Sequence, residues 1–188
     1  MNKHAGSNGR VAIFIDGSNF YHSLKDSQGF HENEIDFEKL VKILKGDNLL
    51  IGVYYYNAPL DRGLNEEIYW KQQRFFDELR RIPGFNVILC TPRKRKLANG
   101  KVEYKMKGDD IHLAIDMVSF AYENTYDTAV IVSGDGDFVP AIKRVQKLGK
   151  DVRNAYFSIS RSDYLRKVCN SSIRMDDHIT DCLRDKKK

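Results

Sequence analysis

Apolar runs alternate with segments of helical periodicity along most of the chain. Runs such as 11–15 (VAIFI) and 128–133 (TAVIVS) have apolar centres without a break, typical of strands covered on both faces of a sheet. In 37–45 (FEKLVKILK) and 65–82, apolar residues recur every three or four positions, which predicts amphipathic helices. The pattern predicts five strands, at 11–15, 49–58, 85–90, 128–133 and 151–157, and later helices at 110–122, 138–148 and 162–169.

Strands that alternate with helices indicate an α/β fold. The expected architecture is Rossmann-like, a mostly parallel, doubly wound sheet with helices on both faces. We expect a flexible leader at 1–10, one domain at 11–175 and a charged C-terminal tail at 176–188. The leader lacks the apolar stretch of a secretion signal, and no segment approaches the roughly 20 apolar residues of a membrane span.

The cysteines and exposed aromatic residues bear on compartment and assembly. Cys90, Cys169 and Cys182 are far apart and odd in number, which indicates reduced thiols in a cytoplasmic protein and no disulfide framework. Tyr69 and Trp70 have two interpretations, an interface of a homo-oligomer or ordinary packing. The oligomeric state therefore stays open.

A basic segment precedes the helix expected near residue 110. Residues 93–107 (RKRKLANGKVEYKMK) carry a net charge of +6, which leaves −1 for the rest of a chain of net charge +5. Asn99-Gly100 is a strong hairpin-turn signal, so the segment predicts a basic β-hairpin arm. The arm is either a solvated hairpin whose lysines prevent edge aggregation or a track for nucleic acid. In the second case the binding residues would be Arg93, Lys94, Arg95, Lys96, Lys101, Lys105, Lys107 and, stacking on a base, Tyr104.

Carboxylates follow two of the predicted strands. Asp16 comes directly after the first strand, Asp135 and Asp137 follow the fourth, and Asp109 and Asp110 begin a helix. Ligands of doubly wound sheets bind beyond the carboxyl ends of the strands, so adjacent first and fourth strands would bring these acids into one crevice. A hard divalent cation with oxygen ligands, Mg²⁺ or Mn²⁺, would remove their mutual repulsion. The alternative is structural, with the acids serving as helix caps and in a polar turn.

Three segments resemble the signature segments of the NYN domain. They are VAIFIDGSNFY (11–21), KMKGDDIHLAIDMV (105–118) and DTAVIVSGDGDFVPAIKRVQKLGKDV (127–152). Their order and spacing are similar to those of the LabA-like branch of this family, which has a PIN-like nuclease fold. The resemblance implies a metal-dependent ribonuclease whose acidic cluster binds Mg²⁺ or Mn²⁺.

The resemblance also implies roles for individual residues. Asp16 and Asn19 match the D-x-x-N of the first strand, Asp110 matches the acid of a K-G-V-D segment, and Asp135 and Asp137 match S-G-D-x-D. It implies that all five are catalytic and that the four carboxylates among them are metal ligands.

Two further acids, Asp109 and Asp116, are second-rank candidates for metal ligands. Asp109 stands where the family has an apolar residue, so it either joins the site or replaces Asp110. Asp116 matches a further acid of the family, but a helical wheel places it on the polar side of its helix. The wheel puts the buried arc of that helix at Ile111, Ala114, Ile115, Val118 and Ala121.

The function implied by the resemblance is hydrolysis of phosphodiester bonds, with RNA as the partner and a 5′-phosphate on the product. Two other classes stay open, a non-catalytic nucleic-acid-binding or regulatory adaptor and a phosphoryl-transfer enzyme for small nucleotides. The chain lacks a P-loop and the third glycine of a dinucleotide-binding fingerprint.

Overall fold

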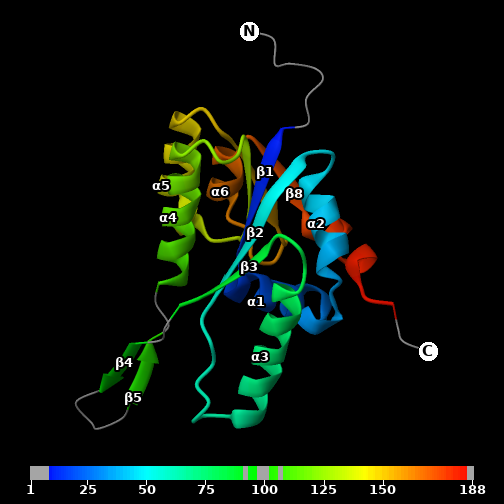
Figure 1. The fold of residues 1–188 in the computed structure, drawn as a ribbon, viewed down its shortest axis with the longest axis vertical. Helices are drawn as coiled ribbons and strands as arrows, with labels where there is room; N and C mark the ends of the chain where they lie inside the picture. Colours follow the sequence, from blue (N-terminus) through cyan, green and yellow to red (C-terminus); the bar gives the residue numbers. More distant parts are fainter. Residues whose placement is uncertain (1–8, 91–92, 97–101, 106–107, 186–188) are drawn as a thin grey trace.

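Six parallel strands form the main sheet (Figure 1). The computed structural model describes residues 9–90, 93–96, 102–105 and 108–185, with the backbone alone for 93–96 and 102–105. The spatial order of the strands is β3-β2-β1-β6-β7-β8, which confirms the parallel α/β sheet. The strands are β1 (Arg10–Asp16), β2 (Leu49–Asn57), β3 (Phe85–Leu89), β6 (Thr128–Val132), β7 (Asp151–Tyr156) and β8 (Ser171–Arg174). Five match predicted strands, and β8 is an additional edge strand.

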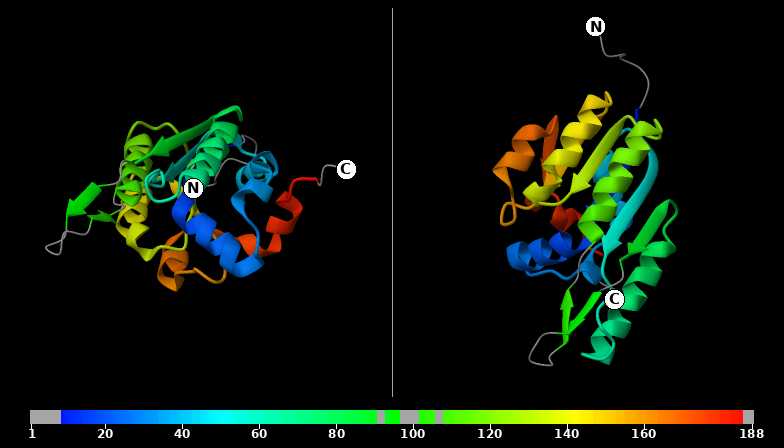
Figure 2. Two further views of the ribbon diagram at one scale, coloured as in Figure 1. Left: turned by 90° about the horizontal axis from the view of Figure 1, so that it is seen from below. Right: turned by 90° about the vertical axis from the view of Figure 1, so that its left-hand side faces the viewer.

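A separate two-stranded sheet stands away from the main one (Figure 2). It pairs β4 (Arg93–Lys96) with β5 (Val102–Lys105) in antiparallel register, with Arg93 opposite Lys105. The predicted turn at Asn99-Gly100, the side chains of the arm, and Lys101 and Lys107 lie outside the described residues. The cationic face of the arm therefore stays a prediction.

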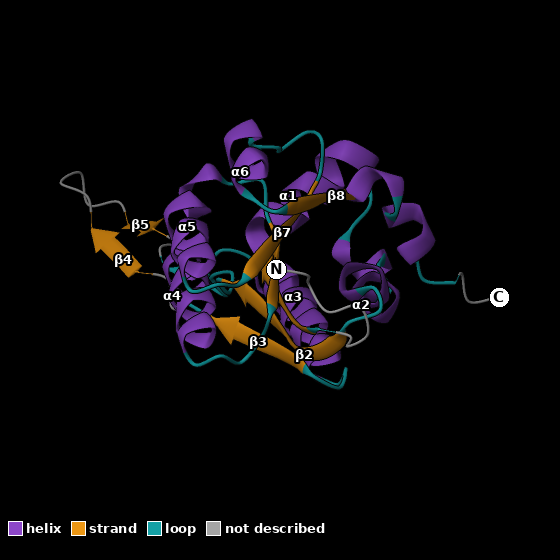
Figure 3. Ribbon diagram, turned by 90° about the horizontal axis from the view of Figure 1, so that it is seen from above, coloured by secondary structure: helices purple, strands orange, loops and turns teal. Residues whose placement is uncertain are grey.

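Helices cover both faces of the sheet (Figure 3). One face carries α1 (Gly17–Gln28), α2 (Phe37–Lys45) and α3 (Glu66–Arg80). The other carries α4 (Asp109–Tyr122), α5 (Val139–Lys147) and α6 (Asp163–Val168). Among the described residues, no helix has both the length and the apolar character needed to cross a membrane.

The central strand shows why its sequence is apolar throughout. Val11, Ile13 and Ile15 of β1 point into the core beneath α1–α3, whereas Ala12 and Phe14 point into the core beneath α4–α6. All five side chains are fully buried. A strand with helices on both faces has no polar side, so the usual alternation disappears.

The segment after β8 is folded, unlike the frayed end expected of a charged tail. The 3₁₀ turns η3 (Met175–Asp177) and η4 (Ile179–Cys182) bury Met175, Ile179 and Cys182 in the α1–α3 core. The backbone N–H of Asp36 donates to the carbonyl of Cys182 at 2.7 Å. The segment therefore closes one edge of the core.

The predicted buried arc of α4 is confirmed at Ala121 but wrong at Ile111 and Ile115. Leu113, Met117 and Ala121 face the sheet, whereas Ile111 is 61% exposed and Ile115 is 56% exposed. The helix carries apolar residues on two faces, and the wheel placed two residues of the outer face in the buried arc. An apolar periodicity cannot distinguish two such faces, so packing against the sheet and α5 decides between them.

Candidate functional site

The candidate site is a cleft at the carboxyl edge of the sheet. β1 and β6 are parallel neighbours, as the convergence of acids required. The chain continues from β1 to β2 on one side, and β6 lies on the other, so the cleft stands at the topological switch point where such sheets bind ligands. Its volume is about 390 Å³. It is lined by Asp16, Ser18, Asn19, His22, Ser23, Asp26, Asp109, Asp110, Asp135, Ile159 and Ser160.

Asp16 is the buried acid of this cleft, with 5% of its surface exposed. It ends β1 and caps α1, because its Oδ1 accepts the backbone N–H of Asn19 at 3.0 Å. Its Oδ2 accepts the hydroxyl of Ser133 at 2.9 Å. Burial raises the pKa of Asp16 to about 6 against the lowering effect of these two hydrogen bonds, and the charges of Asp110 and Asp109 raise it further. One carboxylate thus serves as helix cap and as candidate ligand.

Ser133 connects the ends of β1 and β6. Its hydroxyl donates to Asp16 and accepts the backbone N–H of Asp135 at 3.0 Å. Asp135 Oδ1 accepts the N–H of Asp137 at 2.8 Å, which closes the 3₁₀ turn η2 (Gly136–Phe138). Asp135 lines the cleft, whereas Asp137 is exposed and outside the lining. The two acids of the Gly-Asp-Gly-Asp turn therefore occupy different positions.

Asn19 holds the loop after β6 against α1. Its Oδ1 accepts the backbone N–H of Gly134 at 3.0 Å and lies 3.3 Å from the hydroxyl of Ser23. Ser23 also hydrogen-bonds the hydroxyl of Ser160 at 2.6 Å, so the loop after β7 joins the same network. The approach at Gly134 is close, because a Cβ there would lie 1.8 Å from the carbonyl oxygen of Ser160. Asn19 and its neighbour Ser23 thus connect α1 to the loops after β6 and β7.

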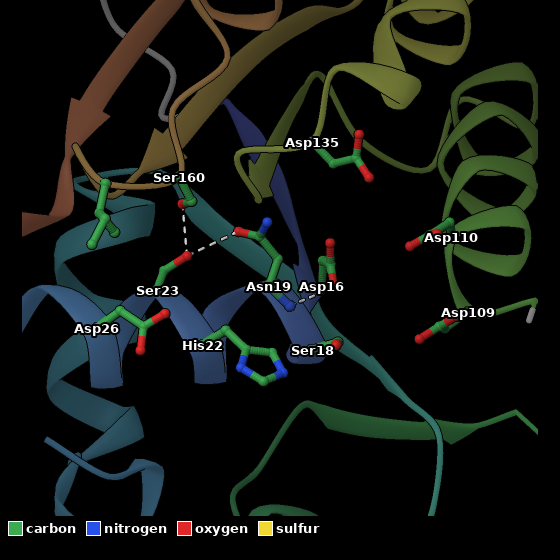
Figure 4. Close-up of a pocket in the computed structure, with 11 residues that line it drawn as sticks. Asp16, Ser18, Asn19, His22, Ser23, Asp26, Asp109, Asp110, Asp135 and Ser160 are labelled. Carbon is green, nitrogen blue, oxygen red and sulfur yellow. Dashed lines mark hydrogen bonds between the residues drawn. The ribbon is translucent and has the colours of Figure 1, made fainter. Parts of the chain in front are cut away.

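Asp109 and Asp110 reach the cleft from the first turn of α4 (Figure 4). Gly108 directly precedes the helix, its φ of +127° favours glycine, and no side chain caps the helix. Asp109 is therefore a lining residue beside Asp110 and not a cap. Burial and the charges of Asp109, Asp135 and Asp137 raise the pKa of Asp110. Carboxylates from three separate segments thus influence one another across the cleft.

Asp116 lies outside the cleft lining. Its Oδ2 accepts the hydroxyl of Tyr56, at the end of β2, at 2.9 Å. Burial first, and then the Asp116 carboxylate, raise the pKa of Tyr56. The acid is half-buried and faces β2, and a hydrogen bond from a phenol gives it a structural role.

A second acid with a raised pKa, the half-buried Glu32, lies close to the cleft. The phenol of Tyr55 donates to Glu32, and burial raises the pKa of Glu32 to about 7. The Tyr55 ring packs against Gly17, where a Cβ would lie 2.6 Å from ring atoms. Gly17 follows Asp16 directly, so this pair supports the strand end that carries the cleft.

The donor set of the cleft suits a hard divalent cation. Asp16, Asp109, Asp110 and Asp135 offer oxygen ligands, and none of them forms an ion pair with a Lys or Arg of the described residues. Within those residues, no three His, Cys, Asp or Glu side chains are close enough to hold one ion directly. The acids surround the cleft, an arrangement that suits Mg²⁺, which keeps several water ligands.

Several lining and supporting residues were not predicted from the sequence. The serines of the network follow from contacts between distant loops, and only Ser133 stood inside a recognised motif, S-G-D-x-D. His22 lies one turn after Ser18 on α1, and Asp26 one turn further, so a helical wheel of α1 would have found this row. The unpredicted residues are Ser18, His22, Ser23, Asp26, Ser133, Ile159 and Ser160.

Comparisons with known proteins agree with the fold and the motifs. A protein-family model, the NYN domain, matches residues 10–176. The chain is 27% identical over 145 residues to the uncharacterised protein MJ0482 of Methanocaldococcus jannaschii, covering 76% of this chain and 45% of that protein. It thus spans less than half the length of this relative. A crystal structure of a protein of unknown function, VPA0982 from Vibrio parahaemolyticus, superposes with a TM-score of 0.71 at 20% identity, covering 94% of this chain and 99% of the other.

The fold and the family match together define the class. A parallel α/β sheet with acids at its switch point is the nuclease-like, PIN-like arrangement expected from the resemblance. The family match covers almost the whole chain, and the chain belongs to the NYN domain family.

Proposed function

We propose that this protein is a metal-dependent ribonuclease that hydrolyses phosphodiester bonds at the switch-point cleft. The observation that carries the proposal is Asp16, a buried carboxylate that faces other carboxylates and has no ion pair among the described residues. Perturbed acids in a cleft mark functional sites, because such a charge destabilises the fold unless a ligand compensates for it. Membership of the NYN domain family supports a nuclease over other phosphate chemistries.

Asp16, Asp110 and Asp135 would hold Mg²⁺ or Mn²⁺ partly through water ligands of the ion, and Asp109 or Asp137 would complete the set. When bound, a divalent ion supplies a water of lowered pKa and positive charge for a phosphate. The protein's own contribution is orientation. Ser133 and the N–H of Asn19 fix the carboxylate of Asp16, and Ser133 also fixes the backbone of Asp135. Acids held in this way need little rearrangement when an ion and a phosphate arrive.

The arm of β4 and β5 is proposed as the track for the RNA backbone. β4 contains Arg93, Lys94, Arg95 and Lys96, and β5 contains Lys105. Replacing the first four by alanine should weaken RNA binding at least about tenfold and flatten its decline with salt, because fewer counterions are released. Fluorescence anisotropy, measured from about 50 to 200 mM salt, gives both the affinity and its dependence on salt concentration. An unchanged salt slope would remove the arm from the binding surface.

Cleavage is tested with labelled single-stranded RNA in Mg²⁺, Mn²⁺ or EDTA. Asp16→Asn and Asp135→Asn should each lower the metal-dependent rate by at least about 100-fold, because each removes a ligand charge. Asp127→Asn is the matched control: the same substitution on the same sheet, at the edge away from the cleft. It should cleave like the parent.

Each outcome of this assay has a distinct meaning. Binding without cleavage in any metal would replace the nuclease by an adaptor. Turnover of mononucleotides with intact RNA would indicate a small-nucleotide enzyme. Equal cleavage by the parent, Asp16→Asn and Asp135→Asn would identify a contaminating nuclease.

A further inference from the structure

The outer face of α4 carries an apolar stripe, most of which is exposed in the described chain. Ile111, Ile115 and Tyr122 are 61%, 56% and 77% exposed, and the half-buried Val118 lies between them. Their spacing of four, three and four residues is that of a helix–helix seam. The right-hand view of Figure 2 looks onto this face of α4 and α5. The inner face of the same helix already contributes Leu113 and Met117 to the core.

The stripe differs from the other exposed aromatic side chains. Trp70 donates to Glu66 at 3.2 Å and lies under the guanidinium of Arg62, 5.3 Å from the ring centroid. Tyr164 accepts a hydrogen bond from Lys143 at 3.0 Å. Tyr122 has no hydrogen bond, ring contact or cation contact with any described residue, although it is more exposed than either. Its apolar surface therefore has no intramolecular partner in that part of the chain.

A shallow groove continues the stripe between the C-terminal ends of α4 and α5. Its volume is about 260 Å³, and it is lined by Val118, Ser119, Tyr122, Glu123, Arg144 and Leu148. Glu123 directly follows α4 and Arg144 belongs to α5, and neither forms an ion pair with a described residue. An apolar centre thus has one unpaired charge of each sign at its margin.

We propose that the groove between α4 and α5 binds a second copy of this chain about a two-fold axis. A two-fold interface must be complementary to itself, and this surface meets that condition. Rotation about an axis through the groove brings Tyr122 and Val118 against their counterparts and places Glu123 beside Arg144 of the other copy, twice. Val118 and Tyr122, four residues apart at the C-terminal end of α4, fit a helix as the partner, and the second copy supplies one.

The position of the groove leaves the cleft open. α4 starts at the cleft with Asp109 and ends at Tyr122, roughly 20 Å away along 14 residues. A pair centred on the C-terminal end of α4 keeps Asp109 and Asp110 distant from Glu123 of the other copy. The cleft lining comes from a single chain, so dimerisation and cleavage are separable.

Sedimentation equilibrium of the full chain tests the proposal. The parent should be a dimer at micromolar concentration. Tyr122→Glu should raise the dissociation constant at least 100-fold, whereas Leu64→Glu, on another surface and 76% exposed, should leave it unchanged. Both variants should keep the parent's circular dichroism spectrum and melting temperature, because both sites are exposed. A monomeric parent at 100 µM, or a dimer unaffected by Tyr122→Glu, overturns the proposal.

Charge reversal identifies the symmetry. Glu123→Arg alone and Arg144→Glu alone should each weaken the dimer about tenfold or more, because each places like charges together at two junctions. An equimolar mixture of the two variants should dimerise as well as the parent, because both junctions of the mixed pair are complementary. Failure of the mixture to recover overturns the two-fold arrangement. RNA cleavage per protomer should be the same in all these variants. A parent that dimerises but does not cleave RNA would contradict the proposed nuclease function and leave the dimer proposal intact.

Discussion

The acids at the two ends of β1 and β6 have opposite electrostatic environments. At the amino edge of the sheet, Arg10 and Asp127 form an ion pair of 2.8 Å, with the ammonium of Lys150 3.7 Å from the same carboxylate. The hydrogen bonds from Arg10 lower the pKa of Asp127 to about 2. At the carboxyl edge, burial raises the pKa of Asp16 to about 6, and its charged neighbours are Asp110 and Asp109.

This difference separates charge that stabilises the fold from charge kept for a ligand. Asp127 is partly exposed and paired, so its carboxylate is more easily ionised in the folded protein than in the unfolded chain. Asp16 is buried, and neutral hydrogen bonds alone offset its desolvation. A position that lowers stability in this way is typical of a functional site. The charges at the amino edge therefore stabilise the fold, whereas those at the carboxyl edge form the candidate site.

The largest effect expected from this comparison is a pH-dependent loss of stability in metal-free protein. The folded-state pKa of Asp16 is raised from 3.8 to about 6 and that of Glu32 from 4.5 to about 7. Their contribution to stability is fully present below the pKa values of the unfolded chain and is lost as pH rises through the folded-state values. For Asp16 the loss is about 3 kcal/mol. Asp127 has the opposite sign, and its contribution disappears as pH falls toward 2. Calorimetry in EDTA should find the highest melting temperature at about pH 4–5, because Asp127 loses its contribution below this range and Asp16 and Glu32 lose theirs above it.

Two variants sharpen this test. Asp16→Asn should raise the metal-free stability at pH 7.5 by about 2–3 kcal/mol, because the amide is neutral and can still bond Asn19 and Ser133. Asp127→Asn should lower it by at most about 1 kcal/mol, as expected for an exposed pair, without changing the slope above pH 5. Mg²⁺ should stabilise the parent and not Asp16→Asn. A melting temperature that rises steadily to pH 7.5 in EDTA would contradict the assignment.

Much of the fold was predictable because burial on both faces leaves an unambiguous pattern. In β1 successive side chains enter the two cores on opposite faces of the sheet in turn, so the whole run is apolar. The meeting of Asp16 with Asp135 was predictable too, because parallel strands end at one edge and β1 and β6 are neighbours. The C-terminal segment was less predictable, because Ile179 and Cys182 are isolated apolar residues in a charged stretch.

Contacts between distant loops leave no periodic trace in the sequence. Ser23 and Ser160 are 137 positions apart, and Ser133 and Asp16 are 117 apart, yet these pairs hold the cleft together. The orientation of α4 was ambiguous for another reason. Its outer residues Ile111 and Ile115 are as apolar as its inner ones, and the inner face is decided by contacts with the sheet.

The smaller effect expected from the comparison concerns backbone packing at the two edges. Gly134, at the carboxyl edge, and Gly9, at the amino edge, both have backbone conformations that other residues adopt. A Cβ at Gly134 would lie 1.8 Å from the carbonyl oxygen of Ser160, whereas at Gly9 the nearest atom would be Asn48 Oδ1 at 3.5 Å. Gly134→Ala should therefore lower the free energy of unfolding by about 1–3 kcal/mol, a typical overpacking cost.

The same substitution should also impair cleavage. A shift of the Gly134 backbone breaks its hydrogen bond to Asn19 and moves Asp135 away from Ser133, so we expect a rate at least about tenfold lower. Gly9→Ala is the matched control and should change stability by less than about 0.5 kcal/mol, as at an ordinary surface site, with full activity. Calorimetry and the RNA assay measure both. If Gly134→Ala leaves stability and cleavage as unchanged as Gly9→Ala does, the loop after β7 moves aside at little cost. The network of serines and Asn19 then does not hold the acids in place.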